Sequence, residues 1–338
     1  MSKISIIGSG GWGTAIAVML SENGHDITLW SYLKEESENL KKNKENIPFL
    51  PGIKLPDSIC YTYKMEDCVN AELIITAVPS HAMRSTAKAL AAAGIKDNSI
   101  ILNISKGLEE KTYLTMSGVL KEELPNCNIA VMSGPSHAEE VSRKIPTTNV
   151  VAASDEVTAN KIQDIMMNPN FRIYTNPDIL GVELGGSLKN VIALCAGILD
   201  GMGLGDNTKA ALMTRGIVEI SRLGVAMGAS EQTFNGLSGI GDLIVTCTSM
   251  HSRNRRAGIL IGKGKTPKEA QEEVNMVVEG VKTCRAAYEL SNKLGVEMPI
   301  VNEAYRVLFE NKSPAEAVKC LMGRDKKHES EKMFLAMG

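Results

Sequence analysis

The sequence of 338 residues predicts an α/β N-terminal domain, built on a doubly wound and mostly parallel sheet, followed by an all-α C-terminal domain. Two observations carry this prediction. Up to about residue 175, continuous apolar runs alternate with helical patterns, as in a parallel sheet that helices cover on both faces. After about Leu180 the β-type runs stop and only helical spacing continues. We therefore expect the first domain over residues 1–180 and the second over 181–338.

Short apolar runs mark the expected strands of the first domain. They are Ile4–Ile7, Ile27–Trp30, Leu73–Val78, Ile100–Ile104, Ile129–Met132, Asn149–Ala153 and Phe171–Tyr174. Helical patterns lie between them, at residues 82–93, 113–123 and 157–167. The proline-rich segment Asn46–Pro56 predicts a loop that interrupts this alternation.

In the second domain, amphipathic spacing predicts helices at residues 184–199, 207–227, 282–294 and 302–309. Two more helix starts are marked by an N-cap hydroxyl, a proline and a glutamate, at Thr266-Pro267 and at Ser313-Pro314. We expect a cleft between the domains, because ligands of such folds bind at the carboxyl ends of the strands.

A G-x-G-x-x-G turn follows the first expected strand and precedes an amphipathic run. Gly8 permits the tight bend, Gly10 lets a pyrophosphate approach the backbone, and Gly13 lets the next helix pack closely on the strand. The first N–H groups of that helix would bind the phosphates. With this context the turn predicts a Rossmann-type dinucleotide site and not merely a ligand-free bend.

The second strand bears on the choice of nicotinamide cofactor. Sites selective for NAD usually place a carboxylate at the end of this strand, where it binds the ribose 2′-hydroxyl. Here the first acidic residue is Glu35, whereas Ser31 and Lys34 lie nearer the strand. This pattern slightly favours NADP over NAD.

Composition limits the partners and the compartment. The net charge of −2 gives no reason to expect nucleic acid or an anionic membrane. Seven cysteines without a C-x-x-C pair indicate reduced thiols, and five histidines without metal-ligand spacing indicate a metal-free site. No stretch is expected to span a membrane, and the chain begins in a strand instead of a signal peptide. We expect a cytoplasmic protein with a small-molecule substrate; a homodimer is compatible with the sequence.

Two lysines are candidates for chemistry. Lys106 follows an expected strand, so its ammonium could bind a carbonyl or phosphate oxygen, or lie in water. Lys189 lies within an apolar helix, where desolvation would lower its pKa enough for a general base; the alternative is a structural lysine. Along the same helix, Ala193, Ala196 and Gly197 are expected to leave space for a ligand.

Two further polar clusters come later in the chain. Asp242 lies in a glycine-rich turn, where it could orient a catalytic lysine or simply cap the turn. The run Ser252–Arg256 is a local basic patch at an expected helix start, and Arg253 suits a phosphate there. We expect Arg255 or Arg256 to be solvated instead.

Together these motifs resemble the bacterial, soluble NAD(P)-dependent glycerol-3-phosphate dehydrogenases. The resemblance runs nearly from end to end and rests on ordered motifs with matching spacing. They are Gly8–Ala15, Asn46–Pro56, Ser105–Leu108, Ser133–Ala138, Ser187–Asn190, Gly239–Leu243, Ser252–Asn254, Val278–Gly280 and Met298–Ile300.

The resemblance implies interconversion of sn-glycerol 3-phosphate and dihydroxyacetone phosphate, which would supply glycerol 3-phosphate for glycerophospholipid synthesis. It implies that Lys189 accepts the proton of the C2 hydroxyl, while Lys106 and Asp242 polarise the carbonyl and organise Lys189. The implied substrate contacts are Lys106, Gly134, Ser136, Lys189, Asp242, Ser252, Arg253 and Asn254. The implied cofactor contacts, beside the glycine-rich turn, are Gly11, Trp12, Tyr32, Lys106, Ala138, Arg253, Val277 and Glu279.

Two positions depart from the family pattern, and two other functions remain open. Gly11 stands where serine is frequent, and Tyr32 stands where histidine or arginine is frequent, which weakens the charge argument for NADP. One alternative is a β-hydroxyacid or 6-phosphogluconate-type dehydrogenase, against which the Ser252–Asn254 motif speaks. The other is a non-catalytic NADP-binding sensor, which would leave Lys106 and Lys189 without a function.

Overall fold

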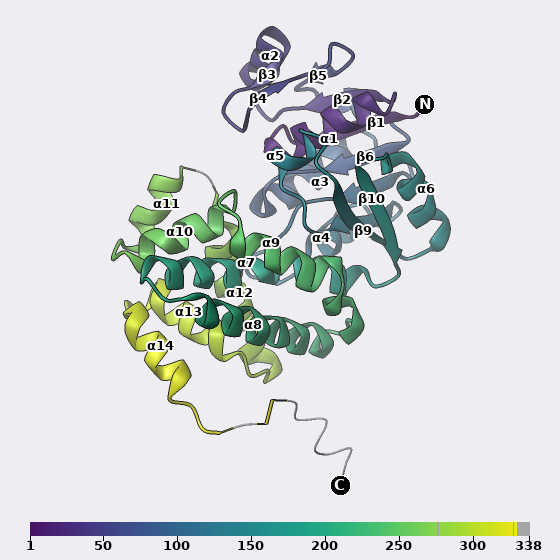
Figure 1. The fold of residues 1–338 in the computed structure, drawn as a ribbon. Coiled ribbons are helices and arrows are strands. Elements are labelled where there is room, and N and C mark those ends of the chain that lie inside the picture. Colours follow the sequence, from purple (N-terminus) through teal and green to yellow (C-terminus); the bar gives the residue numbers. More distant parts are fainter. Residues whose placement is uncertain (276, 327, 330–338) are drawn as a thin grey trace.

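The computed structural model describes residues 1–275, 277–326 and 328–329. Its N-terminal part is a sheet flanked by helices, and its C-terminal part is a packed group of helices (Figure 1). Within the described residues, β-strands occur only up to Asn176, as the sequence pattern predicts.

The sheet has eight strands in the order β10-β9-β8-β7-β6-β1-β2-β5. Their bounds are β1 Lys3–Ile7, β2 Asp26–Trp30, β5 Cys60–Thr62, β6 Leu73–Thr76, β7 Ile100–Asn103, β8 Asn128–Ser133, β9 Thr147–Ala153 and β10 Phe171–Asn176. Neighbouring strands are parallel except for β8 and β9, which pair antiparallel. The predicted doubly wound, mostly parallel sheet is therefore confirmed. Of the eight strands of this sheet, the sequence analysis missed only the short edge strand β5.

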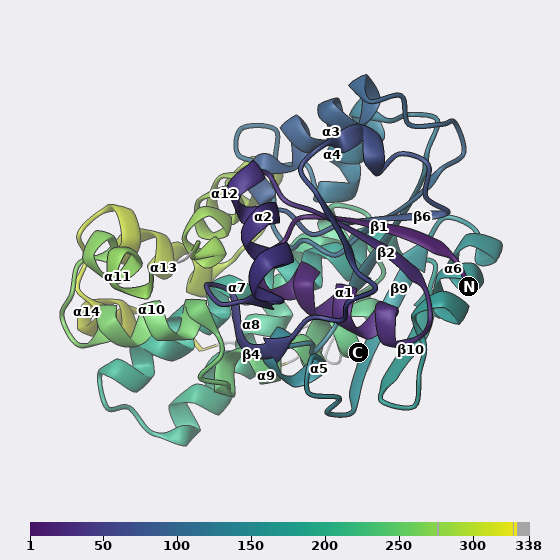
Figure 2. The same cartoon turned by 90° about the horizontal axis from the view of Figure 1, so that it is seen from above.

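Apolar side chains of the central strands alternate between two cores, one on each face of the sheet. In β1, Ile6 packs with α1 and α6, whereas Ile7 packs with α3 and α4. Figure 2 shows α3 and α4 on one side of β1 and β6, with α1 on the other. The helices of this part are α1 Gly11–Glu22, α2 Lys34–Asn43, α3 Met83–Ala92, α4 Met116–Glu123, α5 Ala138–Val141 and α6 Glu156–Met166.

The segment expected to be a loop at 46–56 contains part of a small antiparallel sheet, β3 Glu45–Asn46 paired with β4 Leu50–Lys54. Asn46 fixes it to the glycine-rich turn, since its Nδ2 donates to Ser9 O at 2.8 Å and to Thr14 Oγ1 at 2.7 Å. Proline content alone does not reveal this pairing, because β4 is a short, mostly exposed strand outside the main sheet.

The helical part is built around α7 Ile179–Gly201, which packs against α8, α9, α10 and α12. The bounds of the other helices are α8 Asp206–Ala226, α9 Asp242–Thr248, α10 Arg253–Gly262, α11 Pro267–Val274, α12 Glu279–Leu294, α13 Pro299–Phe309 and α14 Pro314–Met322. Capping boxes at Thr266 and Ser313 are present as predicted. Because β10 ends at Asn176 and α7 begins at Ile179, we propose that the domains divide near residue 180; residues 330–338 of the second domain lie outside the described residues.

By length and composition, α7 could cross a membrane, so the expectation that no stretch would qualify is wrong for this helix. However, 89% of its most apolar window is buried by the rest of the protein. The apolar surface of α7 is thus already covered by neighbouring helices, as in the core helix of a helical domain.

Gly197 of α7 makes room for a helix and not for a ligand, contrary to expectation. A Cβ on Gly197 would overlap the backbone oxygen of Arg255 in α10. In return, a Cβ on Gly258 of α10 would overlap the backbone oxygen of Leu194 in α7. The two helix backbones therefore pack in direct contact, and this contact fixes where α10 begins relative to α7.

We predict that Gly197→Ala destabilises the protein although alanine favours helices. The obstructing atom belongs to the backbone and cannot rotate away, so overpacking should cost about 2–3 kcal/mol of unfolding free energy. Gly118→Ala in α4 is the matched control, because its Cβ would meet only side-chain atoms at 3.4 Å or more. The control should gain up to about 1 kcal/mol. Equal thermal unfolding midpoints for the two variants would contradict the close helix contact.

Candidate active site

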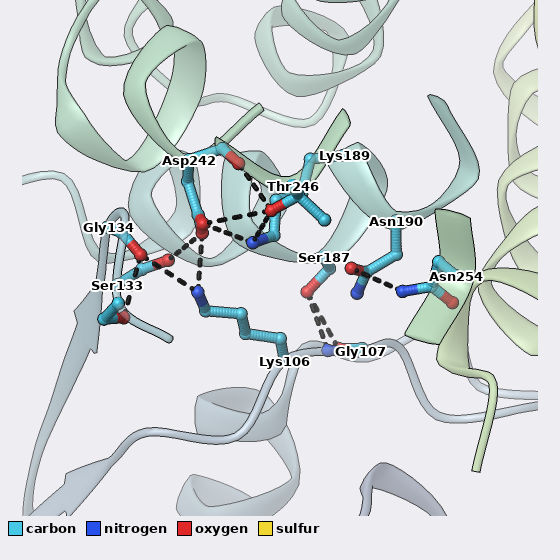
Figure 3. Close-up of polar contacts among 11 residues, drawn as sticks. Lys106, Gly107, Ser133, Gly134, Ser187, Lys189, Asn190, Asp242, Thr246 and Asn254 are labelled. Atoms are coloured by element: carbon cyan, nitrogen blue, oxygen red, sulfur yellow. Dashed lines mark hydrogen bonds and ion pairs between the residues drawn. The ribbon is translucent and has the colours of Figure 1, made fainter. Parts of the chain in front are cut away.

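Three of the predicted residues meet at the carboxyl-terminal edge of the sheet, each from a different element (Figure 3). Lys106 follows β7, Lys189 lies in the middle of α7, and Asp242 is the first residue of α9. Asp242 Oδ2 accepts a hydrogen bond from Lys106 Nζ at 2.6 Å, and Asp242 Oδ1 accepts one from Lys189 Nζ. One carboxylate therefore joins two lysines from the two halves of the chain. We call these three residues the lysine–aspartate cluster.

Burial determines the charge states in this cluster. Lys189 is 5% exposed and Asp242 is 1% exposed. Burial, together with the positive charge of Lys106, outweighs the attraction of Asp242 and lowers the pKa of Lys189 to about 7. The two ammonium groups hold the pKa of Asp242 below its usual value in spite of its burial. At neutral pH, Asp242 is ionised while Lys189 exists in both protonation states.

A glycine-rich turn brings Asp242 to Lys189. The turn Leu237–Gly241 is a π-helix that leads directly into α9. A Cβ on Gly239 would overlap the backbone oxygen of Phe234, and one on Gly185 of α7 would lie 2.6 Å from Ser238 O. Gly185 therefore permits the close approach of the turn to α7, and Gly239 permits the turn to close against Phe234.

Thr246 contacts the lysine–aspartate cluster, and the sequence analysis missed it. Lys189 Nζ donates to Thr246 Oγ1 at 2.7 Å, and Thr246 Oγ1 donates to Asp242 O at 2.6 Å. The sequence does contain a signal for Thr246, because it lies four residues after Asp242 and therefore on the same face of a short helix. A threonine at this spacing is too common to single out without the lysine beside it.

The loop that carries Lys106 is tied to α7. Gly107 N donates to Ser187 Oγ at 2.8 Å. Gly107 has a φ of +152°, and a Cβ there would lie 2.6 Å from the Cβ of Ser80. Lys106 Nζ also donates to Gly134 O at 3.2 Å, and the same carbonyl accepts a bond from Ser136 Oγ at 2.9 Å. The predicted residues Gly134 and Ser136 therefore adjoin Lys106.

The basic patch lies at the start of α10. Ser252 caps this helix by accepting a hydrogen bond from Arg255 N at 3.2 Å. Asn254 Nδ2 donates to Asn190 Oδ1 at 2.9 Å, next to Lys189 in the sequence. Arg253 is exposed. Arg255 is not the solvated residue we expected, since it is partly buried and pairs with Asp200 at 2.7 Å.

The glycine-rich turn has the geometry that a pyrophosphate needs. Gly8 has a φ of +119°, and a Cβ on Gly13 would overlap Gly8 O, so α1 packs directly on the turn. A Cβ on Gly10 would meet nothing within 4 Å, and no side chain caps the first turn of α1. The N–H groups at this open helix start fit a nicotinamide dinucleotide. A Cβ on Gly11 would lie 2.6 Å from Phe49 O, which explains glycine at this position.

The remaining cofactor candidates come from several elements of both parts of the chain. Ala138 begins α5, and its Cβ is 3.9 Å from the position of a Cβ on Gly11. Trp12 is half-buried in α1, and Tyr32 is 80% exposed just after β2. Val277 directly precedes the cap of α12. Glu279 Oε2 accepts a hydrogen bond at 2.7 Å from the hydroxyl of Ser80, which lies four residues after the end of β6.

One part of the cofactor argument is wrong. Ser31 is completely buried, so its hydroxyl is not available to a 2′-phosphate. Lys34 is exposed, and its Nζ lies 3.4 Å from Glu38 Oε1. Among the described residues, no group of three histidine, cysteine, aspartate or glutamate side chains could hold a metal ion.

Comparison with known proteins agrees along nearly the whole chain. Residues 3–159 match the family described as NAD-dependent glycerol-3-phosphate dehydrogenase N-terminus, and residues 178–319 match its C-terminus. The glycerol-3-phosphate dehydrogenase (NAD(P)+) of Fusobacterium nucleatum subsp. nucleatum is 58% identical over 332 residues, 97% of this chain and 99% of the relative. That of Agathobacter rectalis is 55% identical over 330 residues, 97% of this chain and 98% of the relative.

Solved structures agree with this result. The crystal structure of glycerol-3-phosphate dehydrogenase from Coxiella burnetii has a TM-score of 0.92 and 35% identity, covering 96% of this chain and 99% of that one. A D-mandelate dehydrogenase with NADH has a TM-score of 0.61 and 14% identity, covering 94% and 99%. At that identity the likeness shows the fold alone. The chain belongs to the NAD-dependent glycerol-3-phosphate dehydrogenase family.

Proposed function

We propose that this protein interconverts sn-glycerol 3-phosphate and dihydroxyacetone phosphate with NAD or NADP. The observation that carries the proposal is the lysine–aspartate cluster, in which burial lowers the pKa of Lys189 to about 7. It lies where α7 and α9 meet the carboxyl ends of β7 and β8. A general acid or base works best with a pKa near the operating pH, and Lys189 meets this condition.

Lys189 is the proton acceptor of the oxidation. A neutral amine has two N–H groups and one lone pair. Asp242 Oδ1 and Thr246 Oγ1 accept the two N–H groups, which leaves the lone pair for the C2 hydroxyl of the substrate. When bound, the nicotinamide supplies or accepts the hydride at C2. In the reverse direction the ammonium form of Lys189 returns the proton to the carbonyl oxygen.

Lys106 stabilises negative charge on the C2 oxygen. Its side chain is 20% exposed, less buried than that of Lys189, and Asp242 and Gly134 O already orient the ammonium. A preoriented cation contributes most where charge develops in the transition state. Asp242 acts on both lysines, since it holds them in place and partly offsets their charges.

The start of α10 binds the substrate phosphate. Arg253 supplies an exposed guanidinium at the helix N-terminus. The Ser252 oxygen accepts a backbone bond, so its own hydrogen is available to a phosphate oxygen. Asn254 uses Nδ2 toward Asn190 and Oδ1 toward Gly280, which leaves one amide hydrogen for the ligand. Gly134 and Ser136 complete the substrate site beside Lys106.

Gly8, Gly10, Gly11 and Gly13 at the open start of α1 would hold the pyrophosphate of the cofactor. We assign Tyr32 to the adenosine end, because this ring is exposed after β2. The other proposed contacts are Trp12, Lys106, Ala138, Arg253, Val277 and Glu279. No acidic residue lies between the end of β2 and Lys34, so both cofactors are accepted with a slight preference for NADP.

In the cell, the reaction would supply glycerol 3-phosphate for glycerophospholipid synthesis. We place the protein in the cytoplasm, without nucleic-acid partners or membrane insertion, and a homodimer is compatible with this placement. The near-neutral charge and the burial of its one long apolar helix among the described residues support this placement.

Cofactor preference can be tested with Lys34→Glu. We expect the wild-type protein to use NADPH with a kcat/KM up to about tenfold above that for NADH, the range of a single exposed charge contact. A carboxylate at position 34 would repel the 2′-phosphate and should reverse this preference with little change for NADH. An equal loss with both cofactors would contradict the idea that Lys34 lies near the ribose 2′ position.

Lys189→Met and Arg253→Ala should have opposite kinetic signatures. Methionine fills the space of Lys189 without a base, so kcat should fall at least about 100-fold. The KM for dihydroxyacetone phosphate should rise about 10- to 100-fold in Arg253→Ala, with a smaller change in kcat, because a charged hydrogen bond is lost. As a control, the affinity of Lys189→Met for NADPH, measured by fluorescence, should equal that of the wild type. Undiminished turnover in Lys189→Met would refute its role as base.

A further inference from the structure

His137 lies inside the proposed site, yet none of the roles above uses it. It is the N-cap residue of α5 and stands between Ser136 and Ala138, the former assigned to the substrate and the latter to the cofactor. Its Nε2 is buried and has no hydrogen-bond partner among the described residues. Buried polar atoms are nearly always hydrogen-bonded, so an exception at a ligand site indicates a partner that arrives with the ligand.

The ring of His137 faces the loop that carries the basic patch. Its centroid is 5.6 Å from the ring centroid of His251, which lies two residues before Arg253. His251 Nδ1 is 3.8 Å from Glu139 Oε1, so a second contact joins α5 to the same loop. His137 therefore lies against the loop that leads into α10.

The charges around His137 come from several elements. Lys189 of α7 and the Lys106 loop contribute positive charge, while Glu139 and Glu140 of α5 contribute negative charge. Burial, followed by the charge of Lys189, keeps the pKa of His137 below its usual value. At neutral pH the ring is uncharged, and its one N–H can then be carried by Nε2.

We propose that His137 is a further substrate-binding residue, whose Nε2–H donates a hydrogen bond to an oxygen at the phosphate end of the bound triose phosphate. This inference rests on the substrate site proposed above. It adds a donor from the dinucleotide domain to a phosphate otherwise bound by the helical domain.

The test uses two amides that place a donor at different depths. Glutamine puts its amide nitrogen near the position of Nε2, whereas asparagine ends near Nδ1. His137→Asn should raise the KM for dihydroxyacetone phosphate about tenfold or more, and His137→Gln should retain most of the affinity. The KM for NADPH and the thermal midpoint should change little in either variant. His251→Asn is the control and should leave the KM for dihydroxyacetone phosphate within about threefold of the wild-type value.

The wild-type protein offers a second measurement that needs no turnover. In long-range 1H–15N spectra, the Nε2 resonance of His137, identified by its loss in His137→Asn, should shift when dihydroxyacetone phosphate is added to the NADP+ complex. Absence of that shift, or equal KM values for the asparagine and glutamine variants, would overturn the inference. An equal rise in KM for His251→Asn would do so too, because the ring contact would then explain the effect.

The two proposals fail in distinguishable ways. Wild-type protein that binds dihydroxyacetone phosphate with the His137 shift but does not reduce it would refute the proposed function alone. Wild-type protein that reduces dihydroxyacetone phosphate, with both His137 variants kinetically unchanged, would refute the role of His137 alone.

Discussion

The buried carboxylate of Asp242, held between the ammonium groups of Lys106 and Lys189, is the interaction on which the rest of this structure depends. An unpaired buried charge would be strongly unfavourable, and the two lysines provide its compensation. The net charge of the cluster is +1 when Lys189 is protonated and zero when it is not. The cluster can therefore attract an anionic substrate and still leave one lysine able to lose its proton near neutral pH.

Much of the surrounding architecture serves to bring these three side chains together. Gly185 lets the turn before α9 approach α7, Gly239 lets that turn close against the backbone of Phe234, and Gly107 lets the Lys106 loop meet Ser187. Gly197 and Gly258 let α10 lie directly on α7. The basic patch at the start of α10 thereby contacts α7 at Asn190. Backbone contacts of this kind cannot adjust to a larger side chain, so the spacing between acid–base group and phosphate site is rigid.

The central strands could be predicted because both of their faces are buried, so that each strand is a continuous run of apolar residues in the sequence. The sequence analysis missed β5 and β4, which are short and lie at an edge or outside the main sheet. Gly197 in α7 was misinterpreted because a ligand and a tightly packed helix both require a small residue, and only the structure separates the two. Lys106, Lys189 and Asp242 could be singled out as polar residues in apolar surroundings, whereas Thr246 and His137 acquire meaning only from neighbours distant in the sequence.

The most direct test of the cluster is the pH dependence of kcat/KM for oxidation of sn-glycerol 3-phosphate, measured in the wild type and in Asp242→Asn. Oxidation needs neutral Lys189, so the wild-type value should rise through about pH 7 and level off above it. Removing the carboxylate destabilises the ammonium form of Lys189 and lowers its pKa, so the residual activity of Asp242→Asn should rise at a lower pH. Ionisation of the substrate affects the wild type and the variant equally. A midpoint that stays in place or moves to higher pH would contradict the account.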